Sequence, residues 1–312
     1  MTTVSFAKLH GLGNDFLVVD ARDPLGAADP GAAGRALLAA CREHDGLAVR
    51  ICDRHRGVGA DGLLFVRGSL DDPEMVIVNA DGTEPEMCGN GIRCVARWLG
   101  DRHLPEASSL IIRTGNGPLA CGLERDDHGQ VTQVRVDMGP VSDAPADVGL
   151  AGSEQAPWRD RPLRLDSYQL HVTALSLGNP HAVVFTPLSA EGRAHVGPRL
   201  TSHPLFVEGV NAELVRALPA GADGRVRFEV HVHERGCGWT EACGTGATAV
   251  GIAAVWRGLA RYDEPIDVRL PGGWLTIEVT RDDEGRERAF MTGPAAPAYE
   301  GALTLTSFLA PA

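Results

Sequence analysis

Two short segments place a cysteine directly before a glycine-rich corner: Cys88-Gly89-Asn90-Gly91 and Cys243-Gly244-Thr245-Gly246. Each is followed by a run with helix-like character. A thiol at a helix N-terminus lies at the positive end of the macrodipole, which lowers its pKa toward reactive thiolate. Glycines there let the backbone approach an anion such as a carboxylate. Two such thiols on either side of a carbon atom could remove a proton from one face and return one to the other.

The residues after each corner predict a helix. Apolar residues recur at helical spacing over residues 89–99. Residues 244–256 are mostly Gly, Ala and Val, too apolar all round for a surface helix, and we expect this helix to be buried inside its own sheet.

Strand-like runs surround both helices. They are residues 4–9, 16–20, 63–66, 75–78, 110–114 and 131–136 in the first half, and 170–176, 182–185, 212–216, 227–232, 266–270 and 274–279 in the second. Both halves share this order, and the two cysteines lie about half the chain apart. The sequence therefore predicts an α+β fold of two similar domains, each a mostly antiparallel sheet or barrel wrapped around a central helix. Residues 139–157, rich in Pro, Ala, Gly and Asp, have the composition of a linker.

Composition narrows the class of protein. A chain of 312 residues with 44% hydrophobic residues is long enough for two domains. Its net charge of −12 argues against nucleic acid or an anionic membrane as partner. Apolar stretches are short and the N-terminus has no basic-then-apolar pattern, so neither a transmembrane helix nor a signal peptide is expected. We expect a cytoplasmic location.

The cysteines and the single lysine bear on cofactors. Seven scattered cysteines without a Cys-x-x-Cys motif indicate neither a disulfide framework nor a structural metal site. Cys41, Cys52 and Cys121 are expected to be inert core residues. Lys8 is the only lysine, and it lies far in sequence from both corners, which disfavours a pyridoxal-phosphate Schiff base. We therefore expect no cofactor and no metal.

Two alternative functions, a dinucleotide-binding enzyme and a redox sensor, can be compared with the sequence. The glycine patterns at residues 57–62 and 244–249 invite a dinucleotide-binding interpretation, with Asp263 and Glu264 as the acidic residues. The first pattern leads into a strand and the second lacks the βαβ context, so this is disfavoured. The second alternative is a redox sensor with a reversible Cys88–Cys243 disulfide. We interpret such a disulfide as a form of oxidative inactivation and not as the function.

Seven segments of the chain occur in the order of a known family: residues 8–16, 53–55, 57–62, 79–94, 178–181, 209–211 and 234–246. Through them the chain resembles the diaminopimelate epimerase family over nearly its whole length. The resemblance implies an isomerase that interconverts LL- and meso-diaminopimelate without cofactor or metal, on the path to lysine and peptidoglycan. It implies that Cys88 and Cys243 act as base and acid and exchange roles with the direction of reaction.

The remaining motifs imply substrate recognition by similarity. Backbone N–H groups of Gly89, Asn90, Gly244 and Thr245 would meet the α-carboxylate, where fixed dipoles can stabilise the carbanion. Other positions match residues that bind the amino and carboxylate groups: Asn14, Asn79, Asn179, Asn211 and Arg235. Glu234 matches a residue near the ammonium group and the second thiol, and His181 one near the first thiol.

The resemblance also bears on organisation. It implies that the segment from Pro294 returns to the first domain, giving domains of residues 1–138 plus 294–312, with Cys88, and 139–293, with Cys243. It implies a homodimer acting on a small diamino diacid, and closure of the two domains on substrate is expected because the site must exclude water.

The chain departs from the family pattern at two positions, and a second group of enzymes with the same fold is an alternative function. Gly62 stands where some members have a substrate-contacting Gln, and Trp239, which we expect to pack beside the site, stands where an acidic residue is common. Proline racemase and hydroxyproline epimerase share the fold and the two cysteines. Theirs usually have His after the first Cys-Gly, where this chain has Asn90.

Overall fold

The computed structural model describes residues 2–85, 88–152, 154 and 156–309. Glu86 and Met87, which precede the first catalytic candidate in its motif, lie outside the described residues. The chain divides into two compact units, Met1–Val136 with Gly293–Ala312, and Asp137–Thr292. The sequence placed these junctions at 138/139 and 293/294.

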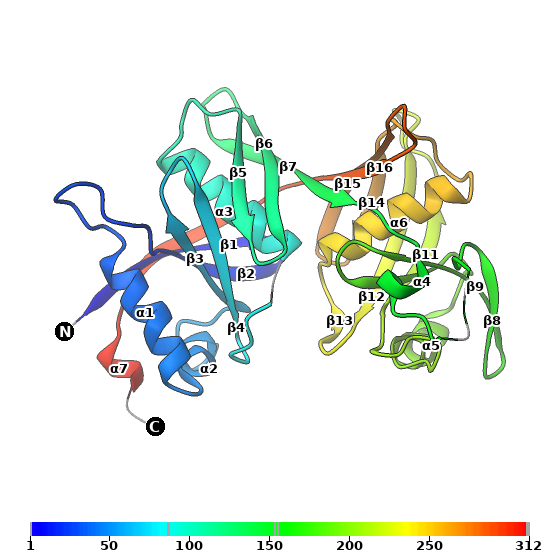
Figure 1. Cartoon of the computed structure of the whole chain (residues 1–312), viewed down its shortest axis with the longest axis horizontal. Coiled ribbons are helices and arrows are strands. Elements are labelled where there is room, and N and C mark those ends of the chain that lie inside the picture. Colours follow the sequence, from blue (N-terminus) through cyan, green and yellow to red (C-terminus); the bar gives the residue numbers. More distant parts are fainter. Residues whose placement is uncertain (1, 86–87, 153, 155, 310–312) are drawn as a thin grey trace. The chain divides into compact units, whose positions relative to one another are not determined.

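The first unit is a sheet bent around one helix (Figure 1). Its strands are β1 (Thr3–Gly11), β2 (Asn14–Asp20), β3 (Gly62–Gly68), β4 (Pro73–Asn79), β5 (Ser109–Thr114), β6 (Gly117–Arg125), β7 (Val131–Pro140) and β17 (Ala296–Thr304). Helix α3 (Gly89–Arg102) packs against β1 to β6. The pairs β2/β3 and β4/β5 are parallel, and the pairs β1/β17, β1/β2, β3/β4, β5/β6 and β6/β7 are antiparallel.

The second unit repeats this pairing. Its strands are β8 (Arg161–Leu165), β9 (Tyr168–Ser176), β10 (Pro180–Val184), β11 (Asn211–Leu218), β12 (Val226–Glu234), β13 (Gly238–Thr240), β14 (Ile266–Leu270), β15 (Gly273–Arg281) and β16 (Glu287–Gly293). The parallel pairs are β10/β11 and β12/β14, and α6 (Gly244–Trp256) packs against β9 to β12, β14 and β15. The predicted α+β fold of two similar domains is confirmed.

Parallel neighbours require crossover connections, and helices supply them. α3 connects β4 to β5 and α6 connects β12 to β14. α1 (Ala32–Glu43) and α2 (Leu47–Cys52) connect β2 to β3, and α5 (Ala190–Thr201) connects β10 to β11. The sequence prediction had only one helix in each half and missed these outer helices. They cover the side of the sheet opposite the central helix, together with α7 (Thr306–Leu309) in the first unit.

The expected linker over residues 139–157 is wrong. β7 continues to Pro140, α4 (Pro145–Val148) follows, and Leu150 bridges to Phe206. Val148 and Leu150 are buried in the core of the second unit. A composition rich in Pro, Ala and Gly predicts turns, but it does not reveal that a few apolar side chains of the segment pack into the core.

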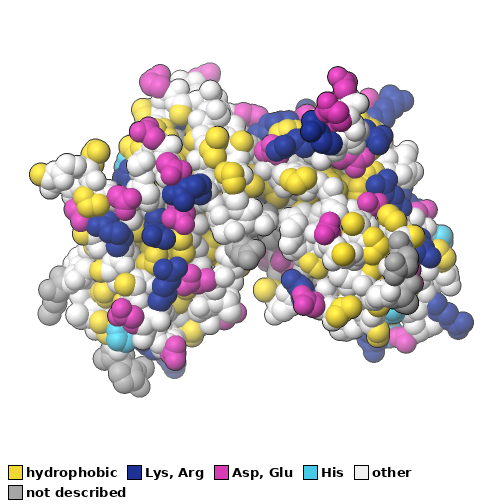
Figure 2. All heavy atoms as spheres, viewed as in Figure 1, with side chains coloured by type: hydrophobic (Ala, Val, Ile, Leu, Met, Phe, Trp, Pro, Cys, Tyr) yellow, Lys and Arg dark blue, Asp and Glu magenta, His cyan; other side chains and the backbone are white. Residues whose placement is uncertain are grey.

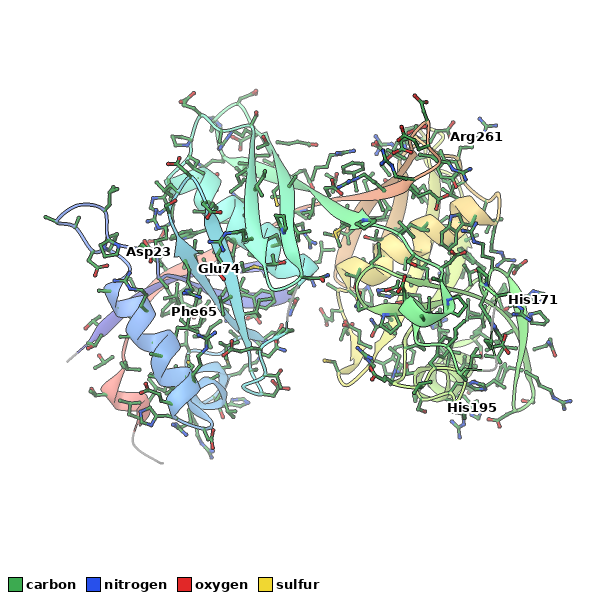
Figure 3. All side chains as sticks on the ribbon, viewed as in Figure 1. Asp23, Phe65, Glu74, His171, His195 and Arg261 are labelled. Atoms are coloured by element: carbon green, nitrogen blue, oxygen red, sulfur yellow. The ribbon has the colours of Figure 1, made fainter. Side chains whose placement is uncertain are left out.

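Most charged side chains lie on the surface of each unit and apolar side chains lie inside (Figure 2). Figure 2 shows basic and acidic side chains interspersed over the visible face of each unit. Phe65, labelled in Figure 3, lies fully buried in the core of the first unit. No helix in the described part of the chain has the length and apolar character needed to cross a membrane.

The central helix of the second unit is enclosed as predicted. Every residue from Gly244 to Val255 is buried. Small side chains make this possible, because a Cβ added at Gly251 would lie 2.5 Å from Cγ2 and 3.0 Å from Cβ of Ile277 on β15. The close approach of helix and sheet therefore depends on this glycine.

The variant Gly251→Ala tests that close approach. Overpacking against the Ile277 backbone-proximal atoms should lower the free energy of unfolding by about 1–2 kcal/mol, although alanine is the better helix former. Urea unfolding followed by circular dichroism measures it. Gly122→Ala is the control, because a Cβ there would lie at an ordinary distance of 3.6 Å from Arg135 Cβ, without positive φ, and we expect a change within about 0.5 kcal/mol. A Gly251→Ala protein as stable as the parent would contradict the packing argument.

Candidate active site

Both central helices begin at the residue after a cysteine, as the glycine pattern predicts. Cys88 is the N-cap of α3, and its Sγ accepts a hydrogen bond of 3.3 Å from the backbone N–H of Gly91. Cys243 is the N-cap of α6, and its Sγ accepts one of 3.4 Å from Gly246. Each sulfur thus takes the place of the usual N-cap oxygen and accepts from an N–H group of the first helical turn.

In the first unit, two of the predicted binding asparagines are joined to the base of α3. Asn90 Nδ2 donates to Asn14 Oδ1 at 3.1 Å. Asn90 Oδ1 in turn accepts from Nη2 of Arg93 at 3.0 Å, and Arg93 Nη1 donates to the Gly89 carbonyl at 2.9 Å. Arg93 is fully buried. A buried guanidinium with fixed acceptors holds Asn90 and the first turn of α3 rigidly.

Asn14 is fixed from its other side by a group that sequence reasoning missed. Its Nδ2 donates to Asp61 Oδ2 at 2.7 Å, and the backbone N–H of Asp15 donates to the same oxygen at 3.0 Å. Arg54 bridges the two carboxylates, at 2.6 Å to Asp15 and 2.7 Å to Asp61. Lys8, the single lysine, lies 2.8 Å from Asp15.

This network sets the charge of Asp15. Burial alone would raise its pKa, but the hydrogen bonds and charges of Arg54 and Lys8 outweigh it and lower the pKa from 3.8 to about 2. The carboxylate is therefore ionised over the whole working range of an enzyme, and Asp61 and Asp15 act as fixed anchors for the Asn14 corner.

Asn79 ends β4 and faces Gly62 in the strand register. Its Nδ2 donates to Thr83 Oγ1 at 3.0 Å. A Cβ at Gly62 would lie 2.8 Å from the Val78 carbonyl oxygen, so no larger residue fits without a shift of the strand pair. The contact expected of a glutamine at this position is absent here.

In the second unit, the candidate thiol is surrounded by polar side chains. Asn179 Nδ2 donates to Thr245 Oγ1 at 3.4 Å, and that hydroxyl lies 3.6 Å from Cys243 Sγ. Glu234 accepts from Thr240 Oγ1 at 2.5 Å and also from the Cys243 thiol. The structure thus brings together four residues that the sequence nominated from two separate segments, residues 178–181 and 234–246.

Burial at Cys243 opposes the lowering of the thiol pKa that a helix N-terminus predicts. Burial raises the pKa of its thiol well above the ordinary value, and the nearby Glu234 carboxyl raises it further. The N–H of Gly246 and the Thr245 hydroxyl lower it, but by less. The helix N-terminus therefore does not suffice to ionise Cys243, because the cost of burying a charge is larger than the macrodipole term.

Asn211 and Arg235 shape the end of β12. Asn211 Oδ1 accepts from the Arg235 backbone N–H at 2.9 Å. The Arg235 guanidinium is partly exposed and donates to the Glu208 carbonyl at 3.3 Å. Trp239 is half-exposed on β13 and its ring lies edge-on to that of His233, with the centroids 5.1 Å apart. Trp239 therefore packs on the strand that carries Glu234.

His181 is paired with a residue that sequence reasoning missed. Its Nδ1 lies 2.7 Å from Glu213 Oε1 and its Nε2 lies 3.1 Å from Asn179 Oδ1. Both side chains of the His181–Glu213 pair are fully buried, in contrast to His171 and His195, which lie at the outer surface of the second unit (Figure 3). An acidic residue inside the apolar strand run 212–216 was the available signal.

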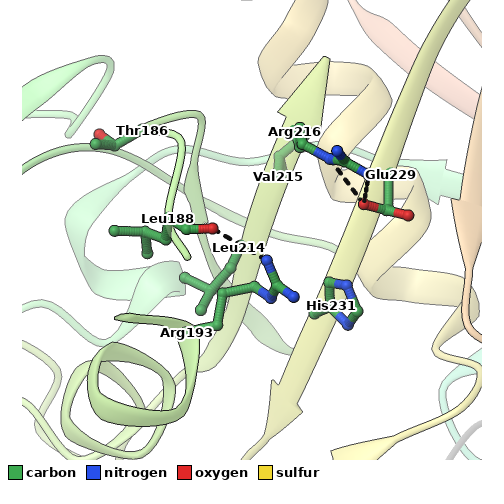
Figure 4. A pocket seen from close by; sticks show the side chains of 8 residues that line it. All are labelled: Thr186, Leu188, Arg193, Leu214, Val215, Arg216, Glu229 and His231. Atoms are coloured by element: carbon green, nitrogen blue, oxygen red, sulfur yellow. Dashed lines mark hydrogen bonds and ion pairs between the residues drawn. The ribbon is translucent and has the colours of Figure 1, made fainter. Parts of the chain in front are cut away.

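The candidate residues form one group in each unit. The first holds Asn14, Asn79, Cys88, Gly89 and Asn90, and the second holds Asn179, His181, Asn211, Glu234, Arg235, Cys243, Gly244 and Thr245. The small cavity in Figure 4, about 10 Å³ and beside the Arg216–Glu229 ion pair, is lined by none of them. Within the described ranges, no cluster of three or more His, Cys, Asp or Glu side chains is arranged to hold a metal ion.

The repeated fold is shared with solved structures at low sequence identity. A phenazine biosynthesis protein of the PhzF family from Bacillus anthracis aligns with a TM-score of 0.64 at 18% identity, over 97% of this chain and 100% of that one. A hydroxyproline epimerase from Agrobacterium vitis aligns with a TM-score of 0.61 at 14% identity, over 97% and 91%. The class is thus that of α+β proteins made of two similar units, each a sheet around a central helix.

Sequence relatives define the family within that class. The family model for Diaminopimelate epimerase matches residues 6–143 and 173–297. The Diaminopimelate epimerase of Desulforudis audaxviator is 41% identical, over 96% of this chain and 98% of its own. That of Heliobacterium modesticaldum is 36% identical, over 97% and 100%. The chain belongs to the diaminopimelate epimerase family, a family of isomerases.

The Asp15 network predicts a specific acid sensitivity. Because the folded-state pKa of about 2 lies below the ordinary 3.8, the stabilisation is present above about pH 4 and is lost as the pH falls toward 2. Its size is about 2 kcal/mol. Urea unfolding from pH 5 to pH 2 should show this loss in the parent and a correspondingly shallower dependence in Asp15→Asn. Asp72→Asn, at an exposed acid, is the control. Parallel curves for the parent and Asp15→Asn would contradict the assignment.

Proposed function

We propose that this protein interconverts LL- and meso-diaminopimelate without a cofactor, with Cys88 and Cys243 as the two proton-transferring groups. The observation that carries the proposal is the repeated thiol-capped helix, each with asparagine side chains beside its first turn. The named relatives support the substrate, because they align over nearly the full length of the chain.

The chemistry demands a preorganised site. An amino acid α-proton is very weakly acidic, so the carbanion left by its removal needs fixed dipoles and exclusion of water. The N–H groups at the starts of α3 and α6 supply such dipoles for the α-carboxylate. One sulfur takes the proton as thiolate and the other, a thiol, delivers a proton to the opposite face, which inverts the centre.

The protonation state of Cys243 suggests its resting role. Since burial and Glu234 favour the protonated thiol, Cys243 is the acid at the start of one direction and Cys88 the base. After turnover Cys243 is left as the thiolate and Cys88 as the thiol, and the reverse direction begins there. The two forms of the free enzyme differ only in which sulfur holds the proton.

The binding groups suit a substrate with two amino acid centres. An amide side chain can accept a hydrogen bond from an ammonium group and donate one to a carboxylate, and four are available: Asn14, Asn79, Asn179 and Asn211. The partly exposed Arg235 guanidinium can form an ion pair with a carboxylate. Proline, the substrate of the alternative racemase function, lacks a second centre. The family resemblance supports a homodimer acting in the cytoplasm, on the path to lysine and peptidoglycan.

Isotope exchange tests the reaction. Purified protein incubated with LL-diaminopimelate in D2O should isomerise it and introduce deuterium at one α-carbon, followed by NMR. Cys88→Ala and Cys243→Ala should each lose roughly 10²-fold or more in rate, the usual size of acid–base catalysis. Cys41→Ala, in outer helix α1, should retain the parent rate. Exchange of proline in place of diaminopimelate would favour the racemase alternative, and a normal rate in either catalytic variant would overturn the two-thiol mechanism.

A charge change tests the state of Cys243. Removing the neighbouring carboxylate in Glu234→Gln should lower the pKa of the Cys243 thiol, because a thiolate no longer faces a negative charge. The pH dependence of iodoacetamide labelling at Cys243, read by mass spectrometry, reports it independently of access. Glu241→Gln, at an exposed neighbour in sequence, is the control. An unchanged profile in Glu234→Gln would show that Glu234 does not govern this thiol.

A further inference from the structure

The two units differ at one buried pair of positions. His181 faces Asn211 across the parallel pair β10/β11, and Glu213 is two residues further along β11. In the first unit the parallel pair β2/β3 places Phe16 opposite Gly62, and Leu64 is two residues further along β3. The positions held by His181 and Glu213 in one unit are thus held by Phe16 and Leu64 in the other.

The central helices confirm this correspondence. A Cβ at Gly91 of α3 would meet Leu64 Cδ2 at 3.1 Å, and a Cβ at Gly246 of α6 would meet Glu213 Oε1 at 3.1 Å. Leu64 and Glu213 therefore occupy the same place beneath the first turn of their helix.

The fold itself does not require polar groups at these positions. Phe16 and Leu64 are 2% and 0% exposed and fill the site with carbon. A buried imidazole and carboxyl are less favourable than apolar residues of similar volume unless every polar atom is satisfied. Within the described part of the chain, Glu213 Oε2 has no hydrogen-bond partner. The second unit thus keeps a pair that packing alone would replace.

The hydrogen bonds locate the protons. With Asn179 Nδ2 directed at Thr245 Oγ1, its Oδ1 faces His181 Nε2, and an acceptor oxygen at that distance favours hydrogen on this nitrogen. In a neutral imidazole the other nitrogen, Nδ1, is then an acceptor, so Glu213 must donate to it. Burial lowers the pKa of His181 to about 3 and raises that of Glu213, which gives the same neutral pair, with Glu234 and Arg235 as the nearby charged groups.

We propose that Glu213 is a positioning residue that, as a neutral carboxylic acid, fixes His181 as its Nε2–H tautomer and through it aims Asn179 at Thr245 beside the Cys243 thiol. The proposal deepens the proposed function, because it assigns the support of the second thiol's surroundings.

Neutral Glu213 also has an electrostatic consequence. The missing side chain at Gly246 brings the carboxyl close to the thiol, since a Cβ there would lie 3.1 Å from Glu213 Oε1 and 3.2 Å from Cys243 Sγ. A second carboxylate this near, besides Glu234, would oppose thiolate formation at Cys243. Holding the proton on Glu213 removes one of the two carboxylate charges, those of Glu213 and Glu234, that would otherwise oppose a thiolate at Cys243.

Nitrogen NMR of the parent protein tests the proton positions directly. In ¹⁵N-histidine-labelled protein, the His181 signals, assigned by difference against His181→Gln, should show a neutral ring with hydrogen on Nε2 throughout the neutral pH range. An imidazolium ring, or hydrogen on Nδ1, would overturn the proposal. Infrared difference spectra of the parent against Glu213→Gln should contain the C=O band of a protonated carboxyl, and a carboxylate band instead would overturn it without any assigned resonance.

Variants then test the positioning role. Glu213→Gln keeps an N–H donor toward Nδ1 and should keep the Nε2–H tautomer, with kcat within about threefold of the parent. Glu213→Met has similar volume but no donor, and should lose that tautomer and lower kcat by roughly tenfold or more, the effect of breaking one buried hydrogen bond. Equal tautomers and equal kcat in Gln and Met variants would overturn the proposal.

A double variant separates stability from positioning. His181→Phe with Glu213→Leu copies the apolar pair of the first unit and should fold at least as stably as Glu213→Met, while its kcat stays low. A double variant with parental kcat would overturn the proposal. Since the NMR and infrared readouts need no substrate, inactivity toward diaminopimelate would reject the proposed function while leaving the proton positions measurable.

Discussion

The structure depends on one constraint: a helix enclosed by its own sheet begins with backbone N–H groups that have no acceptor within the helix. Both units place a sulfur there, Cys88 at α3 and Cys243 at α6, and each accepts from a glycine N–H three residues on. The glycines that follow add no side chain that would keep an anion from the first turn. Because several strands of the sheet pack against each helix, the position of each sulfur is fixed relative to the adjoining strand ends, where Asn14 and Asn79, or Asn179 and Glu234, lie.

The two units fix their asparagines by opposite electrostatic means. In the first, Asn14 is held by ionised groups, with Asp61 and Asp15 bridged by Arg54, at a partly exposed edge where charges remain solvated. In the second, Asn179 is held by the buried His181–Glu213 pair, which the low dielectric keeps neutral. A buried charge there would act directly on Cys243. The duplicated fold thus keeps its geometry while the polarity around each thiol is adjusted separately.

Differences between equivalent positions point to function more sharply than similarities do. The shared pairing of strands and the small-residue helices serve the packing of both units. Asn90 and Thr245 occupy the same position after their cysteines but have different partners. Asn90 hydrogen-bonds to Asn14 and to the buried Arg93, whereas the Thr245 hydroxyl lies beside the sulfur of Cys243. Leu64 and Glu213 are both fully buried at equivalent positions, but one side chain is apolar and the other is a carboxyl. A sequence repeat identifies the scaffold, and only superposition of the pairing registers shows where it has diverged.

By itself the sequence determined the two cysteine corners, the helices that begin at residues 89 and 244, the α+β duplication and the family resemblance, because these signals are local or repeated. It did not find α1, α2 and α5, or the packing of residues 139–157, since their apolar contacts are made with distant strands. The link from Arg93 through Asn90 and Asn14 to Asp61, and the His181–Glu213 pair, join segments far apart in the chain. Tertiary structure alone decided that the pKa of the Cys243 thiol is raised, because this pKa depends on burial and on the nearby Glu234 carboxyl, and neither can be read from the residues beside the cysteine.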